Sequence, residues 1–353
     1  MNEGERKRLR AAVLRREAQH EEAETMQDTM TVDAVADIGN ATAIVAVVAN
    51  GKADIWRVPT AKADMTLELP AKLASDDTVI AYSDGVPVAL GWSALRYSDT
   101  PTAGRSDAGR YGAFTLDFVL AGIATKVKAE RVTVKTLIVT VPAELVDQVR
   151  DGLIKAVKGT HRFTMDGREI VITLAKVRVE AEAAVALNSI KANGRTILID
   201  GGGGTTQLAM TDAAGRFMTA RTRGTGLQRA LDVVSDRLKT THGRGLTMME
   251  RTQVEQAMIA GEPYRIRTES GLLDVISLVR SVLDRVAGTI IADIKERIPA
   301  WKMADQIVLV GGQAYHLRAA YEAAFPGITI PKQPEYANVR GALALLNASE
   351  EVS

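Results

Sequence analysis

The sequence contains no cysteine, and this absence excludes disulfide bonds, thiolate catalysis and metal centres with cysteine ligands. Histidine is scarce as well, with four residues that lie far apart and lack the spacing of a helical HxxxH pair. A metal site built mainly from imidazole is therefore not expected. A chain without cysteine is compatible with a reducing cytosol, and we expect a cytoplasmic protein.

Long apolar runs are also missing. No stretch approaches the ~20 residues needed to cross a bilayer, and the N-terminus lacks the apolar core of a secretory signal. The 44 Lys and Arg residues nearly balance the 43 Asp and Glu residues, so no global positive field drives nonspecific binding to nucleic acid. We therefore expect neither a membrane span nor direct sequence-specific binding of nucleic acid.

Three common catalytic signatures are absent too. The chain has no G-x-x-x-x-G-K-[ST], which disfavours a P-loop ATPase, and no G-x-S-x-G nucleophile elbow. Gly224-Thr225-Gly226 lacks the remaining glycine and the strand context of a dinucleotide fingerprint. We interpret this segment as the entry to a helix near a nucleotide.

What the chain does contain is one short motif twice. Residues 37–42 and 200–205 both read D-x-G-x-x-T, each after an apolar β-branched run and before a second strand-like run. Asn50-Gly51 and Ala214-Gly215 then mark a turn into a third run in each copy. A chain of 353 residues can build more than one hydrophobic core. We therefore predict two lobes that present matching turns across a shared cleft.

The remaining sequence alternates strands, breakers and helices, as in α/β layers. Residues 240–268 differ, because Gly243, Gly261 and Pro263 punctuate a short helix there, and we predict a small appended subdomain. The first 30 residues form a charged zone with too few large apolar residues to bury a core face. We predict a solvated tail; contact with a neighbouring subunit, an adaptor or DNA is the alternative. Helices are expected at 114–128, 143–157, 227–238, 272–298 and 336–346, and buried strands at 136–141 and 306–310.

The order of these motifs resembles that of the actin-type ATPases. The two turns resemble the phosphate-1 and phosphate-2 motifs, and residues 307–312 resemble the adenosine motif, while 177–184 and 337–342 resemble the two connecting segments. The resemblance covers roughly residues 31–348 and is greatest to the bacterial actin-like proteins of the ParM/StbA type, which assemble ATP-dependent filaments that segregate plasmids.

This resemblance implies an α/β, actin-like fold with two ribonuclease-H-like domains around a nucleotide cleft. Domain I is expected at 31–187, with the helix 336–348 returning to it, and domain II at 188–335. Glycine in each turn lets backbone N–H groups approach a phosphate closely. The predicted nucleotide-binding residues are Asp37, Gly39, Asn40, Thr42, Gly202, Gly203, Gly204, Thr205, Gly224, Gly311, Gly312 and Gln313.

Asp37 and Asp200 are expected to bind Mg²⁺ through its water molecules, because carboxylates accept hydrogen bonds from the shell of a hydrated cation. Either aspartate could instead cap its turn. By the resemblance, Glu180 polarises the hydrolytic water together with Asp200 at the metal, and Glu182 is the competing choice. Glu180 could also merely complement a helix dipole. The chain departs from the family pattern at Val179, Gln207 and Gln313.

The predicted function is a filament-forming ATPase that binds ATP, or GTP, with Mg²⁺ and acts in plasmid or DNA segregation. Its expected partners are other copies of the chain and a DNA-bound adaptor protein. Because the same fold serves many functions, two alternatives remain: a small-molecule kinase or phosphatase, and a nucleotide-dependent interaction module.

Overall fold

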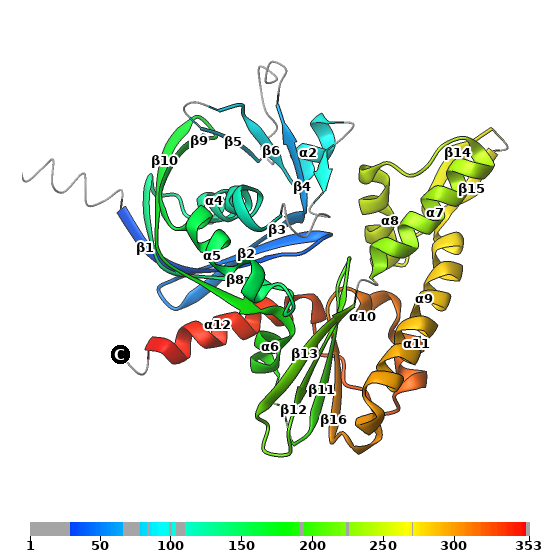
Figure 1. Cartoon of the computed structure of the whole chain (residues 1–353). Coiled ribbons are helices and arrows are strands. Elements are labelled where there is room, and N and C mark those ends of the chain that lie inside the picture. Colours follow the sequence, from blue (N-terminus) through cyan, green and yellow to red (C-terminus); the bar gives the residue numbers. More distant parts are fainter. Residues whose placement is uncertain are drawn as a thin grey trace, which may run out of the picture.

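The protein consists of two lobes, each built on its own β-sheet (Figure 1). Most of the predicted N-terminal tail, and also Gly224, lie outside the described residues. In the described part of the chain no helix is long and apolar enough to cross a membrane. The computed structural model describes residues 29–65, 78–82, 85–98, 101–103, 110–190, 192, 194–223, 226–269 and 271–350.

The first lobe contains a sheet to which the described residues contribute ten strands. It curves around the helix α4 (Thr115–Lys126), and α5 (Val146–Val157) packs beside its longest strand (Figure 1). In spatial order the strands are β3 (Lys52–Pro59), β2 (Thr42–Ala49), β1 (Thr29–Ile38), β8 (Arg131–Val141), β10 (Arg168–Ala181), β9 (Gly159–Met165), β5 (Val79–Ala81), β6 (Val88–Leu90), β4 (Ala61–Asp64) and β7 (Thr102–Ala103).

Side chains of β1 alternate between the two faces of this sheet, as strand geometry requires. Ala36 and Ile38 belong to the core on the α4 side, whereas Val35 packs with Val339 of α12 (Ala337–Glu350) on the opposite side. The C-terminal helix therefore covers the outer face of the first lobe, where the sequence predicts a returning helix.

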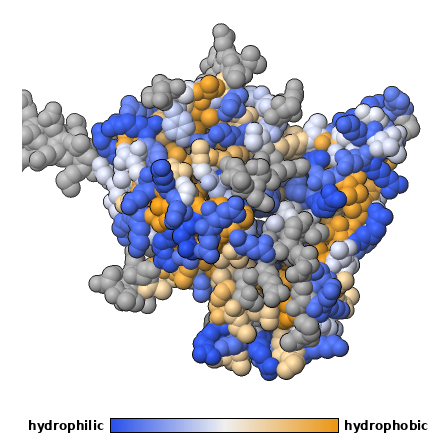
Figure 2. All heavy atoms as spheres, viewed as in Figure 1, coloured by the Kyte–Doolittle hydropathy of each residue, from blue (hydrophilic) through white to orange (hydrophobic). Residues whose placement is uncertain are grey.

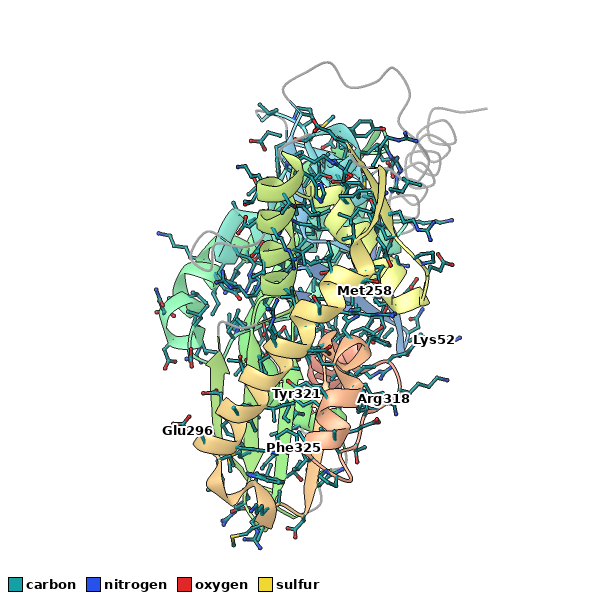
Figure 3. All side chains as sticks on the ribbon, turned by 90° about the vertical axis from the view of Figure 1, so that its right-hand side faces the viewer. Lys52, Met258, Glu296, Arg318, Tyr321 and Phe325 are labelled. Atoms are coloured by element: carbon teal, nitrogen blue, oxygen red, sulfur yellow. The ribbon has the colours of Figure 1, made fainter. Side chains whose placement is uncertain are left out.

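The second lobe contains a smaller sheet, for which the described residues supply four strands. Its helices cover one face. Tyr321, in α11 (Arg318–Ala324), and Phe325, which follows that helix directly, lie between α11 and α9 (Val275–Arg297), and the centroids of their stacked rings are 6.3 Å apart (Figure 3). In spatial order the sheet is β13 (Phe217–Arg223), β12 (Thr206–Thr211), β11 (Thr196–Gly201) and β16 (Gln306–Val310), and the covering helices are α7 (Leu227–His242), α9 (Val275–Arg297) and α11 (Arg318–Ala324).

A helical arm extends from the second lobe toward the first and includes the predicted subdomain (Figure 1). Thr247 and Glu250 form a reciprocal capping box at the start of α8 (Met248–Ala260), and β14 (Arg265–Thr268) pairs with β15 (Gly271–Asp274). The long helix predicted from residue 272 therefore begins only at α9, where Asp274 caps it. Apolar atoms reach the surface over this arm, on the right in Figure 2.

Short segments join the two lobes. The helix α6 (Glu182–Ala186) packs against both sheets and against α12. A β-carbon at Gly341 of α12 would overlap the carbonyl oxygen of Val185, so glycine permits backbone contact between the two helices. The other short elements are α2 (Trp92–Tyr97), the kinked turn η1 (Arg110–Phe114), η2 (Leu187–Ser189), η3 (Pro299–Met303), α10 (Gln313–His316) and η4 (Pro334–Tyr336).

Candidate functional site

The two D-x-G-x-x-T turns have the same backbone structure. In the first, the N–H of Gly39 donates to the carbonyl of Thr42 over 3.0 Å, and in the second, the N–H of Gly202 donates to the carbonyl of Thr205 over 2.8 Å. Each turn joins two antiparallel strands, β1 to β2 in one lobe and β11 to β12 in the other. The repeated sequence motif thus forms a repeated structure on two separate sheets.

The turns touch each other across the boundary between the lobes. A β-carbon on Gly203 would lie 2.8 Å from the Cβ of Ala41, and one on Gly204 would overlap the side-chain amide of Asn40. Positions 40 and 203 are equivalent in the motif, as are 41 and 204, so the contacts follow a local pseudo-two-fold arrangement. Glycine in the second turn is required by this close approach.

Strand alternation brings the two aspartates together. Asp37 follows Val35 on the α12 face of its sheet, and Asp200 follows Leu198 on the corresponding face of the other sheet. Asn338, in the first turn of α12, donates one hydrogen bond of 2.9 Å to Oδ2 of Asp200 and a longer one of 3.4 Å to Oδ2 of Asp37. One amide therefore bridges carboxylates from both lobes.

These carboxylates and the neighbouring Glu182 have raised pKa values because they are buried. Burial raises the pKa of Asp200 to about 6, and the charge of Asp37 adds to the shift, while the Asn338 hydrogen bond opposes it. Burial also raises the pKa of Asp37, against hydrogen bonds from Thr140 and Asn338. The pKa of Glu182 lies well above its usual value because of burial and then the charges of Asp37 and Asp200.

This cluster fits a hydrated divalent cation. Positive charge would offset the buried negative charge, and the buried Oδ1 of Asn338 accepts no hydrogen bond within the described structure, so it offers an acceptor to a water molecule. Among the described residues no three acidic or histidine side chains are placed to hold a metal ion directly. Contact through water, as predicted for Asp37 and Asp200, suits this geometry. When bound, Mg²⁺ would neutralise charge on the phosphates.

Of the two glutamates that the sequence leaves open, Glu182 is among the residues that line the cavity and Glu180 is not. Glu182 begins α6, lines the cleft and accepts a hydrogen bond from Nε2 of Gln207. Glu180 is aligned with Thr140 in β8, two strands and therefore roughly 10 Å from β1. Its side chain is 30% exposed and is paired with Nη2 of Arg178 at 2.8 Å. Glu180 stays a prediction from the sequence, and its competitor Glu182 is the one of the two that lines the cavity.

The predicted adenosine loop borders the second turn. Gly311 has a φ of +82°, and a β-carbon there would come within 2.5 Å of both Oδ1 of Asp200 and the carbonyl oxygen of Gly201. Gln313, which replaces the small residue of the family pattern, is buried and donates from Nε2 to the carbonyl of Gly202 over 3.0 Å. The Gln313 side chain therefore supports the second turn from within the protein.

The turns enclose a cavity of about 130 Å³. This volume is below the roughly 300–1,000 Å³ that is typical of ligand pockets. All predicted binding residues line the cavity except Gly224, which lies outside the described residues. The lining residues that sequence reasoning left without a role are Ala41, Ile44, Arg57, Arg110, Gln207, Leu227, Glu255, Ile259, Tyr315, Glu335 and Asn338.

Comparison with known proteins identifies the class of fold. No protein-family model matches the sequence, and no curated protein matches it either. Three solved structures superpose on about nine-tenths of the chain. They are ParM from Bacillus thuringiensis with ATP (TM-score 0.66, 15% identity, covering 92% of this chain and 100% of that one), the archaeal actin homolog Ta0583 in complex with ADP (0.66, 14%, 91% and 99%) and a non-polymerisable quadruple mutant of pCBH ParM (0.72, 14%, 90% and 99%).

The chain therefore has the actin-like fold, and the fold class predicted from its sequence is confirmed. The resemblance to bacterial and archaeal actin homologs extends over 91% of the chain in structure. At 14–17% identity this likeness shows the fold alone. The chemistry of the cleft must be argued from the chain's own residues.

Proposed function

We propose that this protein binds a magnesium nucleoside triphosphate, ATP or GTP, between its two turns and hydrolyses it. One observation carries the proposal: two turns with the same internal hydrogen bond, on separate sheets, meet beside aspartates that Asn338 bridges. A duplicated glycine-containing turn suits a polyphosphate held from both sides, because such turns can present backbone N–H groups to phosphate oxygens. The paired aspartates suit the water shell of its metal ion.

Each residue has a role in this proposal. The turns at Gly39 and Gly202 hold the phosphates, while Asp37 and Asp200 orient metal-bound water. Glu182 accepts a proton from the attacking water as the water oxygen bonds to the terminal phosphorus, and the bridging oxygen leaves with the diphosphate. Positioning and electrostatics supply most of the rate in such reactions, which suits a cleft built from oriented amides and buried charge.

We further propose that nucleotide binding controls self-association into filaments. A nucleotide gripped by both turns would tie the lobes into one geometry, and loss of the terminal phosphate would release that tie. Support comes from the solved structures of similar fold, which include ParM with ATP and a ParM variant described as non-polymerisable. Plasmid or DNA segregation through a DNA-bound adaptor is our prediction for the cellular role.

Three measurements on the full chain test these steps. Titration with fluorescent ATP and GTP analogues, with and without Mg²⁺, measures binding; phosphate release measures hydrolysis; light scattering followed by electron microscopy detects polymers. We expect magnesium-dependent binding, hydrolysis and nucleotide-dependent filaments. Hydrolysis without polymers would remove the filament role, phosphate transfer that requires an added small-molecule acceptor would indicate a kinase, and absence of binding would overturn the whole proposal.

A further inference from the structure

Arg110 is a buried cation in the cleft to which the sequence analysis gives no role. It opens the kinked turn η1, is 3% exposed and lines the cavity. Its Nη1 donates to Oδ1 of Asn40 in the first phosphate turn, and its Nη2 donates to the hydroxyl of Tyr111. Its carbonyl accepts a 2.5 Å hydrogen bond from Oγ1 of Thr115, which begins α4. Both the backbone and the side chain of Arg110 are therefore held at the wall of the cleft.

The guanidinium lines the same cavity as the candidate hydrolytic residue Glu182 and interacts with it electrostatically. Its positive charge lowers the pKa values of Glu182 and Asp37, against the stronger effect of burial. It also lies over the ring of Tyr111, 4.7 Å from the centroid. A buried cation is costly unless negative charge surrounds it, and here the carboxylates provide that charge.

Few cationic side chains line the cleft among the described residues. The described lining residues include two cations, Arg57 and Arg110. Arg57 is 3.8 Å from a carboxylate oxygen of Glu335 and lies over the ring of Tyr336, beside the predicted adenosine loop. A triphosphate placed against the buried carboxylates would need a cation close to its terminal group. Arg110 is held next to the first turn by its hydrogen bond to Asn40.

We propose that Arg110 binds the terminal phosphate of the bound triphosphate and stabilises the charge that develops there during hydrolysis. This inference rests on the proposed function. A planar guanidinium can donate two parallel hydrogen bonds to phosphate oxygens, and Nη1 would exchange the Asn40 oxygen for a phosphate oxygen. The residue acts in cis, from the same chain that holds the nucleotide. It makes the cleft distinguish a triphosphate from a diphosphate, because only the triphosphate carries the group that Arg110 contacts.

The test compares Arg110→Gln with wild type and with Arg162→Gln, which removes an exposed arginine of the same lobe, 63% exposed in its side chain. Binding of ATP and ADP analogues and single-turnover phosphate release are measured with Mg²⁺. We expect Arg110→Gln to slow hydrolysis by about 10³-fold or more, as for other arginines that act on a transferred phosphoryl group. ADP affinity should stay within about threefold of wild type while the preference for ATP disappears, and Arg162→Gln should behave as wild type.

Two results would overturn the inference while leaving the proposed function intact: wild-type turnover in Arg110→Gln, or equal losses of ATP and ADP affinity, which indicate a structural role. If the glutamine variant does not fold, Arg110→Lys decides, because lysine keeps the charge without the planar fork. Reduced turnover with unchanged ADP binding supports the inference, and wild-type turnover contradicts it. A wild-type protein that binds no nucleotide would instead remove the proposed function itself.

Discussion

The two D-x-G-x-x-T turns have the same backbone hydrogen bond but carry different side chains. Positions 40 and 41 of the first turn are Asn and Ala, whereas the equivalent positions 203 and 204 of the second are both Gly. Side chains of the first turn occupy the space that these glycines leave. In the first turn the motif therefore supplies side chains that reach the other lobe, and in the second turn it supplies glycines that leave room for them.

A second difference lies directly across each hairpin from the aspartate. Asp37 is paired with Ile44, which packs in the apolar core under α12. Asp200 is paired with Gln207, whose amide donates to Glu182. The first hairpin thus contributes packing at this position, and the second contributes a polar contact that positions the candidate base. Substitutions that exchange these features test whether the difference matters.

The largest effect on turnover is expected from removing the carboxylate of Glu182, which Gln207 of the second hairpin holds by a hydrogen bond. Glu182→Gln should lower turnover by about 10²–10⁴-fold, the usual contribution of a positioned acid or base, with nucleotide affinity retained. Glu180→Gln is the matched variant, and we expect near-normal turnover from it because its carboxylate pairs with Arg178 outside the cavity. Steady-state phosphate release checks both, and a loss confined to Glu180→Gln would return the catalytic role to that residue.

The next largest effect is on the stability of the protein without ligand, through Asp200 of the second motif. The pKa of Asp200 is about 6 in the fold against an ordinary value of 3.8, so its stabilising contribution is complete below pH 3.8 and is lost as pH rises through 6. Asp200→Asn should therefore raise the free energy of unfolding at pH 7.5 by up to about 3 kcal/mol and change it little at pH 3.8. Urea unfolding at both pH values measures the difference.

The control for this experiment is an aspartate whose pKa is shifted in the opposite direction, so the pH dependence of its effect on stability is reversed. Asp212, in the turn between β12 and β13, has a lowered pKa because the backbone and side chain of Arg216 donate to it. Its contribution to stability is present above the ordinary pKa and is lost as pH falls, so Asp212→Asn should be the more harmful change at pH 7.5. An Asp200→Asn variant less stable than wild type at pH 7.5 would contradict the burial argument.

The third effect comes from making the second turn like the first. Gly204→Ala places a β-carbon against the amide of Asn40, and overpacking of this kind costs about 1–3 kcal/mol. Asn40→Ala should relieve the clash, so the double variant should be more stable than the two single effects predict. Gly152→Ala, in open space on α5, is the control and should be neutral or stabilising. Additive effects in urea unfolding would show that the turns do not touch.

The smallest effect follows from giving the second hairpin an apolar partner like that of the first. Gln207→Leu removes a hydrogen bond that lowers the pKa of Glu182. The pKa should rise, so the acid limb of the rate profile should move to higher pH, and turnover should fall about tenfold. Gln306→Leu, in β16 of the same sheet, is the control, and an unchanged pH profile in Gln207→Leu would reject the positioning role.

Local signals explain which parts of the fold were predictable. The repeated strand–turn–strand units follow from β-branched runs and glycine turns that act within a few residues. The strands β5, β6 and β7 were not predicted, because two or three residues carry no periodicity and their pairing depends on distant strands. Residues 272–274 were predicted to be helical but pair as part of β15, since their hairpin partner outweighs helical spacing.

The residues of the candidate site also fall into those that the local sequence predicts and those that depend on tertiary packing. Its turns were predictable because glycine and aspartate spacing is a local pattern, and the cleft brings those residues together. Arg110 gave no comparable signal, since a lone arginine in a polar region is ordinarily exposed. Asn338 lay within a segment that resembles a family motif, but its bridge depends on how α12 docks on both lobes. The distinction between Glu180 and Glu182 depends on where β10 ends and α6 begins.

The position of Asn338 in the chain has a consequence for synthesis. Ribosomes must add 138 residues after Asp200 before the amide that joins it to Asp37 exists. Until then, no amide from this position is available to bridge the two carboxylates. The contact that joins the lobes at Asp37 and Asp200 is therefore among the last that synthesis makes possible.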